Sequence, residues 1–168
     1  MLPGKRRVPE HRESVSSQTE RVYLRVSTLL GGKLIKEVKC VPSCEVAMGF
    51  HTAVMEGFTV VQAERVRGAY GIPQKDFFRL VGVTERTASR KLRSTRRLSV
   101  ASSDRVLRLA RVIAFATEVF GNDVGARSWL NKKQKALCGV KPTDMLATEE
   151  GTRQVENLLG AIEHGLYI

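Results

Sequence analysis

The feature that most constrains the fold is an apolar run that follows Ser99 and ends at Phe120-Gly121. Apolar residues recur there at the three- and four-residue spacing of one helix face: Val106, Leu109, Ala110, Ile113 and Ala116, with Leu107, Phe115 and Val119 widening the face. Ser99 can cap the start of this helix. A helix this apolar must be buried on more than one side. We therefore expect it either to bridge two halves of the chain or to form a dimer seam.

Other segments show the same helical spacing and end at glycines. One run begins at Cys44 and stops at Gly57, and another stops at Gly71. A last helix is predicted after Thr148, with Gly165 where a helix stop is expected. No segment shows sustained alternation with a period of two, so we predict an all-α fold.

Length and hydropathy restrict the class of protein. A chain of 168 residues buries roughly two-thirds of its unfolded surface, so it needs no metal or disulfide to hold a core. No stretch reaches the ~18 apolar residues of a membrane span, and the polar start does not resemble a secretory signal. We expect a cytoplasmic protein without a membrane partner.

The positive charge is concentrated in one block. Residues 60–111 hold 13 Lys and Arg against 4 Asp and Glu, a net charge of +9 within a chain total of +11. Residues 1–59 carry +3 and residues 112–168 carry −1. This asymmetry favours a polyanion-binding module joined to a segment with another task; the alternative is a basic face that serves solubility alone.

The basic block has the pattern of a helix-turn-helix. Pro73 suits a helix start, and the short helix that follows ends at Gly82. Thr84 can cap a second helix, from Glu85 to about Arg93, with Ala88 turned toward the core. A short helix, a tight turn and a helix that presents Arg, Ser and Thr are typical of DNA-binding proteins. Two features fit this pattern less well, the bulky Phe78 in the first helix and the small Ala88 in the second, and each can compensate the volume of the other.

The predicted DNA-binding residues are Thr84, Arg86, Thr87, Ser89, Arg90, Lys91, Arg93, Arg96 and Arg97. Arginine can grip guanine through two hydrogen bonds, and Ser or Thr can pair with several base edges in the major groove. The cationic groups from Lys91 onward suit phosphates, which position the protein without discriminating sequence. Proteins of this kind usually read paired half-sites, so operator DNA and a homodimer are expected.

No arrangement for catalysis or metal binding stands out. The three histidines are His11, His51 and His164, and none neighbours a Ser or Cys in a nucleophile motif. The three cysteines lack the spacing of a disulfide framework or a zinc site. We expect no enzyme activity, no catalytic residue, no cofactor and no metal.

Many positions in order then carry a family resemblance. In the second half these are Ser102 to Arg111, Val119-Phe120-Gly121, Trp129-Leu130, Gly151, Leu158-Leu159 and Gly165; in the first half they are Leu30-Gly31-Gly32, Gly57 and Gly82 to Thr87. Over about residues 29–168 the chain resembles the Xre/MbcA/ParS-type antitoxins of bacteria. It departs from that family at Lys133, where Pro is expected, at Cys138, where Gly is expected, and at Phe58-Thr59.

The resemblance implies an antitoxin of a type II toxin-antitoxin system. Its partner would be a RES-domain toxin or a related ADP-ribosyltransferase-like enzyme that consumes NAD. The C-terminal domain would block the NAD pocket of this toxin, and the helix-turn-helix would repress the shared operon. Carried onto this chain, the toxin-binding residues would be Glu163, His164, Gly165, Leu166, Tyr167 and Ile168. The alternative is a plain helix-turn-helix repressor whose C-terminal half only dimerises.

The expected organisation has three parts. Residues 1–20 are polar and rich in Arg, Ser and Glu, which is typical of a disordered basic tail. Residues 21–98 form the helix-turn-helix DNA-binding domain. Residues 99–168 form the linking helix and a small helical toxin-binding domain.

Overall fold

The computed structural model describes residues 11–32, 43–92 and 96–166. These residues form helices, one isolated β-bridge and no strand, so the predicted all-α class is confirmed. The elements in chain order are α1 (His11–Leu29), α2 (Ser43–Glu56), α3 (Val60–Tyr70), α4 (Gln74–Val81), α5 (Glu85–Leu92), α6 (Val100–Phe120), α7 (Asp123–Asn131), the 3-10 helix η1 (Lys135–Leu137), α8 (Pro142–Met145) and α9 (Glu149–Glu163).

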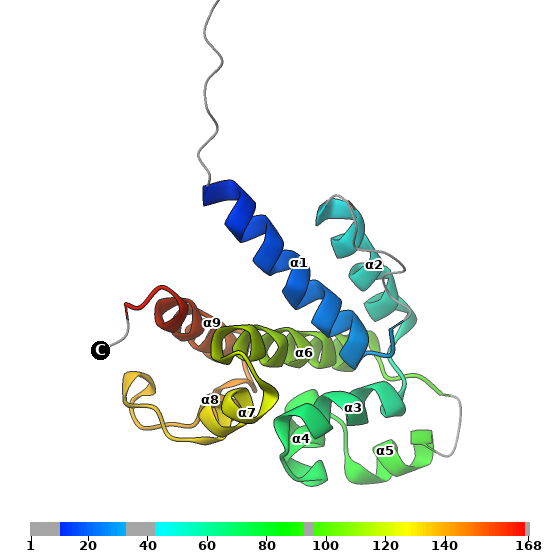
Figure 1. Cartoon of the computed structure of the whole chain (residues 1–168). Helices are drawn as coiled ribbons and strands as arrows, with labels where there is room; N and C mark the ends of the chain where they lie inside the picture. The colour runs from blue at the N-terminus through cyan, green and yellow to red at the C-terminus, as the bar shows by residue number, and fades with distance from the viewer. Residues whose placement is uncertain (1–10, 33–42, 93–95, 167–168) are drawn as a thin grey trace, which may run out of the picture.

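The long helix α6 is the centre of the fold. It packs against α1, α2, α3, α4, α7 and α9, so both halves of the chain are built around it (Figure 1). Ser99 caps its start through a hydrogen bond from the Ser102 N–H, and Gly121 ends it in the left-handed conformation. Of the two roles predicted for this helix, the bridge is therefore the one that the structure shows.

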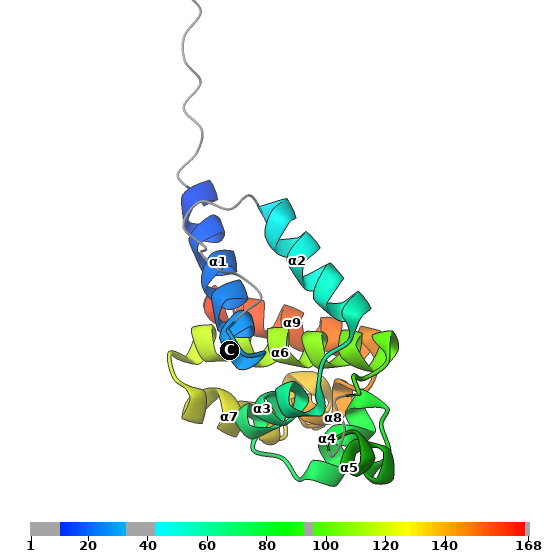
Figure 2. The same cartoon turned by 90° about the vertical axis from the view of Figure 1, so that its right-hand side faces the viewer.

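The first half places α3, α4 and α5 below α6, and α1 and α2 above it (Figure 2). Thr59 and Gln62 form a capping box at the start of α3, and the Gln62 side chain also donates to the Leu30 carbonyl oxygen at 2.8 Å. At Gly57 an added Cβ would lie 2.5 Å from the Leu98 carbonyl oxygen, so the chain can pass there only with glycine. The helices predicted to end at Gly57 and Gly71 are confirmed as α2 and α3.

The N-terminal helix α1 corrects the predicted tail. Residues 1–20 were expected to be disordered, but α1 begins at His11, so the prediction is wrong for residues 11–20; residues 1–10 lie outside the described residues. The physical reason lies far along the chain. Gln18, within the segment predicted to be disordered, donates to Glu163 of α9. Directly after this segment, Glu118 of α6 accepts from Arg21 at 2.9 Å and from Arg25 at 3.2 Å. These contacts hold a helix whose own sequence is mostly polar.

In the second half, α7 and α9 pack against α6, and α8 packs against α7 and α9. Asn122 caps α7 and Thr148 caps α9, each through a side chain that accepts a backbone N–H. The Trp129 ring is partly buried and lies 5.6 Å from the Phe120 ring, measured between centroids. None of the described helices is long and apolar enough to cross a membrane.

Candidate functional site

The turn between α4 and α5 is built by a left-handed glycine. Gly82 (φ 75°) donates to the Arg79 carbonyl oxygen at 3.1 Å, and Val83 donates to the Phe78 carbonyl oxygen at 2.8 Å. This pair of bonds closes α4 and leaves α5 free to start after two residues. Arg105 of α6 lies over the turn and donates to the Val81 carbonyl oxygen at 3.4 Å. An added Cβ at Gly82 would lie 1.9 Å from Nη1 of Arg105, so the turn accepts only glycine without rearrangement.

Helix α5 turns one face inward and the other outward. Thr84 accepts from the Thr87 N–H at 3.2 Å, which is the cap predicted from the sequence. Ala88 is 2% exposed, whereas Arg86, Ser89 and Arg90 are exposed. The structure thus brings the predicted base-reading residues of this helix to one outer surface, with Thr84 exposed and Thr87 half-buried at its start.

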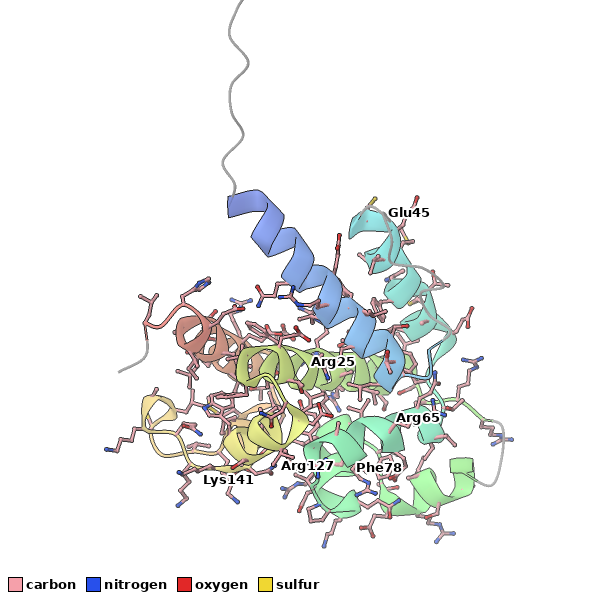
Figure 3. All side chains as sticks on the ribbon, in the orientation of Figure 1. Arg25, Glu45, Arg65, Phe78, Arg127 and Lys141 are labelled. Atoms are coloured by element: carbon pink, nitrogen blue, oxygen red, sulfur yellow. The ribbon has the colours of Figure 1, made fainter. Side chains whose placement is uncertain are left out.

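Phe78 and Ala88, the two residues that fit the helix-turn-helix pattern less well, are both buried. Phe78 of α4 is fully buried (Figure 3). It meets the Phe77 ring edge-on, with centroids 5.7 Å apart. A residue as small as Ala88 on α5 leaves volume for large side chains on α4. The pattern that fits poorly by sequence therefore still forms a closed core.

Of the remaining predicted phosphate contacts, only Arg96 and Arg97 have side chains that the structure describes. The side chain of Lys91 and the whole of Arg93 lie outside the described residues, and Arg96 is exposed. Arg97 donates from Nη1 to the Gly57 carbonyl oxygen at 2.7 Å and lies 3.9 Å from a Glu56 carboxylate oxygen. The structure therefore gives Arg97 a bond within the protein, which the sequence does not reveal because its acceptor is 40 residues away.

A basic pair on α4 joins this surface and was not predicted from the sequence. Lys75 and Arg79 are exposed and line a hollow of about 440 Å³ together with Gly82, Val83 and Thr84. Arg79 also lies 3.6 Å from Asp76. The spacing of four residues between two cations on an amphipathic helix is the signal that could have identified them.

The C-terminal segment extends an apolar side chain into solvent. Gly165 (φ 66°) closes α9, and Leu166 donates its N–H to the Ala161 carbonyl oxygen at 2.8 Å. Glu163 accepts a hydrogen bond from Gln18 of α1. Glu163, His164 and Gly165 are exposed, and Leu166 is 76% exposed. Tyr167 and Ile168, predicted with them as toxin-binding residues, lie outside the described residues.

Metal binding has no support within the described part of the chain. No three side chains of His, Cys, Asp or Glu are grouped there as a metal ion would require. The histidine of the C-terminal segment, His164, sits at the end of α9.

Comparison with known proteins matches both halves of this architecture. Residues 49–111 match the family described as "Antitoxin Xre-like helix-turn-helix domain". Residues 115–165 match the family described as "Antitoxin Xre/MbcA/ParS C-terminal toxin-binding domain". The boundary between the two matches falls within α6.

Relatives support the same assignment. The protein named Antitoxin Xre of Pseudomonas putida is 32% identical over 68% of this chain and 71% of its own length. The protein of the same name from Photorhabdus laumondii is 31% identical over 66% of this chain and 76% of its own. The "Prs ADP-ribosylating antitoxin" of a Sphingobium species is 28% identical over 68% of this chain and 77% of its own. The match to a toxin-binding domain favours an antitoxin over a plain repressor. The chain belongs to the Xre family of antitoxins, with a helix-turn-helix domain followed by a toxin-binding domain.

Proposed function

We propose that this antitoxin neutralises a RES-domain or related ADP-ribosyltransferase-like toxin, one that consumes NAD, by placing its C-terminal segment in the active site of the toxin. The segment is Glu163 to Ile168. It would act as part of a type II system in the cytoplasm of a bacterium. The protein itself would contribute no catalysis.

The observation that carries this proposal is the exposure of Leu166. A leucine side chain costs free energy when it stays in water, and burying one fully is worth about 1.5–3 kcal/mol. Leu166 follows the last turn of α9 and is 76% exposed, and the sequence continues with Tyr167 and Ile168. An apolar, aromatic segment suits a pocket built for a nucleotide. The name of the Sphingobium relative, which includes ADP-ribosylation, supports a toxin that handles NAD.

A matched pair of variants tests the proposal. Leu166 and Val124 are exposed to nearly the same extent, 76% and 78%, in the same domain. Leu166→Asp, or deletion of residues 166–168, should restore toxin activity when co-expressed with the toxin of the neighbouring gene, measured as growth and intracellular NAD. Val124→Asp should keep the toxin silent. Equal inhibition by all three variants would remove the C-terminal segment from the mechanism.

We further propose that the protein represses its own operon as a homodimer through α5. The supporting observation is the exposed row of Arg86, Ser89 and Arg90 on a helix anchored by a buried Ala88. Residues 21–98 would serve this task, and residues 99–168 would serve toxin binding. A dimer would place two α5 helices in successive major grooves, about 34 Å apart. A reporter fused to the upstream region should be repressed by the wild type, and mass measurement by light scattering should give twice the chain mass.

A further inference from the structure

Four lysines lie within ten residues of sequence between α7 and α8, outside both sites described above. They are Lys132, Lys133, Lys135 and Lys141, all exposed, and we name them the lysine platform. We propose that the lysine platform binds DNA phosphates beside the helix-turn-helix, so that the toxin-binding domain also contributes to the DNA contact. This inference rests on DNA binding by the helix-turn-helix half.

The backbone beneath the lysine platform is held by several hydrogen bonds. Gln134 and Val140 form an isolated antiparallel bridge, with the Gln134 N–H donating to the Val140 carbonyl oxygen at 3.1 Å. The buried Gln134 side chain donates to the carbonyl oxygens of Trp129 and Lys132, both at 3.1 Å. The turn is closed by the Gly139 N–H, which donates to the Gln134 carbonyl oxygen at 2.9 Å. The four ammonium groups therefore extend from a fixed base.

The lysine platform is tied to the helix-turn-helix half at a defined position. Arg127 of α7 donates to the carbonyl oxygens of Ala69 and Gly68 at 3.1 and 3.0 Å, and Asn131 donates to that of Tyr70 at 3.0 Å. These three acceptors form the last residues of α3, directly before α4. The end of α7, from which the lysine platform continues, is thus fixed to the helix-turn-helix.

A cleft of about 650 Å³ lies between α4 and the end of the lysine platform at Lys141. It is lined from α4 by Asp76 and Arg79 and from the other side by Lys141 and Asp144. Lys141 lies at the lower edge of the molecule, on the side where α4 and α5 lie (Figure 3). Arg79 lines both this cleft and the hollow beside Thr84, so α4 lies between the start of α5 and Lys141.

The charges of the C-terminal domain are separated. The segment from Lys132 to Thr143 contains no Asp or Glu, and within the described residues no carboxylate oxygen lies within 4.0 Å of a lysine platform ammonium group. Several acidic residues of the domain instead meet arginines of α1 and α6: Glu118 meets Arg21 and Arg25, Glu149 meets Arg108, and Glu156 meets Arg111.

The carboxylates near the lysine platform do not cancel its charge. Asp76 is compensated by Arg79 at 3.6 Å, and Asp144 follows Lys141 at the start of α8. Four lysines and one carboxylate leave a strongly positive surface. Unpaired lysines on a fixed base, continuous with a DNA-binding face, fit the regular phosphate charge of a duplex, which lysine contacts without reading sequence. An acidic surface of a protein partner would be the other class of ligand, and the experiment separates the two.

The test measures DNA affinity against salt concentration with the full chain. The probes are a duplex from the upstream region of the gene and a mixed-sequence duplex of the same length. Each phosphate contact contributes about 0.9 to the slope of log affinity against log salt. The variant Lys132→Ala/Lys133→Ala/Lys141→Ala should lower this slope by about 2–3 and weaken both duplexes by the same factor. Circular dichroism and thermal unfolding should match the wild type, because the three side chains are exposed.

A charge-matched control isolates position from net charge. Lys141→Ala and Arg153→Ala each remove one exposed cation, the first from the lysine platform and the second from α9. Lys141→Ala should lower the slope by about 1, and Arg153→Ala should leave it unchanged. If the triple variant binds both duplexes like the wild type, the lysine platform has no DNA role while the helix-turn-helix role stands. If it loses toxin binding alone, the surface belongs to an acidic protein partner and the proposal is overturned. If the wild type binds neither duplex, DNA binding itself fails and the proposal falls with it.

Discussion

The hydroxyl group of Tyr70 donates a hydrogen bond of 2.8 Å to the carbonyl oxygen of Leu109 and so joins α3 to α6 in the core. Tyr70 is among the largest fully buried side chains. Burial, and after it the carboxylate of Glu156, raise the pKa of the Tyr70 hydroxyl well above its ordinary value of 10.0. The residue that closes the helix-turn-helix half onto the central helix is therefore neutral in the folded state.

Tyr70→Phe should lower the free energy of unfolding at pH 7 by about 0.5–1.5 kcal/mol, since it removes one buried hydrogen bond without leaving a cavity. The Leu109 carbonyl oxygen is within helix α6, so its loss of one donor is mild. Urea unfolding followed by circular dichroism measures this difference. A change above about 3 kcal/mol would show that the hydroxyl does more than bridge the two helices.

The same substitution should change the response to alkaline pH. The unfolded chain releases the Tyr70 proton near its ordinary pKa, while the folded chain keeps it, so the folded state loses stability as the pH rises above about 10. Below that pH the folded and the unfolded chain both hold the proton, so Tyr70 adds nothing to the pH dependence of stability. Lysines titrate in the same range, so the measured quantity is the difference between wild type and Tyr70→Phe. This difference should shrink from pH 9 to pH 11, and a constant difference would contradict the assignment.

Local chemistry explains which parts of the fold the sequence predicts. Ser99 and Thr148 cap α6 and α9, and Gly82 and Gly165 close helices in the left-handed conformation, as their residue types indicate. Each of these caps and helix ends is determined by residues within about five positions along the chain. The central position of α6 follows from the width of its apolar surface, because contact on one side alone would leave part of that surface exposed.

Contacts between distant residues explain what the sequence did not reveal. Helix α1 is held by Gln18, which donates to Glu163 of α9, and by Arg21, which donates to Glu118, 97 residues further along the chain. Arg97 bonds to the Gly57 carbonyl oxygen, and nothing in its own segment distinguishes it from Arg96. Lys141 lines a cleft with Arg79 of α4, and the adjoining end of α7 is fixed to the end of α3 by Asn131. Such relationships arise in tertiary packing, which periodicity does not encode.

Gly82→Ala should destabilise the protein by more than Gly121→Ala, although both glycines have similar positive φ values of 75° and 72°. The left-handed conformation costs an alanine about 1–2 kcal/mol at either site. At Gly121 nothing lies within 4 Å of the added Cβ, whereas at Gly82 it would meet Arg105. Denaturant midpoints measure the two costs. The double variant Gly82→Ala/Arg105→Ala should recover the part due to the collision, and no recovery would place the whole cost in the backbone.

Arg90 and Arg97 should separate DNA recognition from stability. Arg90→Ala should leave the unfolding midpoint unchanged, because the side chain is exposed, and should cost about 1–3 kcal/mol of binding on specific DNA if it reads a base. Arg97→Ala should lower the unfolding midpoint, because it removes the 2.7 Å bond to the Gly57 carbonyl oxygen. Fluorescence anisotropy on operator and mixed-sequence duplexes, beside urea unfolding, measures both. Equal loss on the two duplexes would make Arg90 a phosphate contact.

Cys138 should be replaceable by glycine with a gain in stability. Among the described residues it is the one non-glycine with positive φ, at 54°, directly before Gly139 at 77°. The left-handed conformation costs a residue with a Cβ about 1–2 kcal/mol, while glycine adds about 0.5–1 kcal/mol of entropy loss on folding. Cys138→Gly should therefore raise the free energy of unfolding by about 0.5–1 kcal/mol. Cys138→Ala, which keeps the Cβ and removes the exposed thiol, should leave it near the wild-type value. Urea unfolding midpoints in reducing buffer measure these differences. An equal gain from Cys138→Ala would assign the cost to the thiol rather than to the backbone.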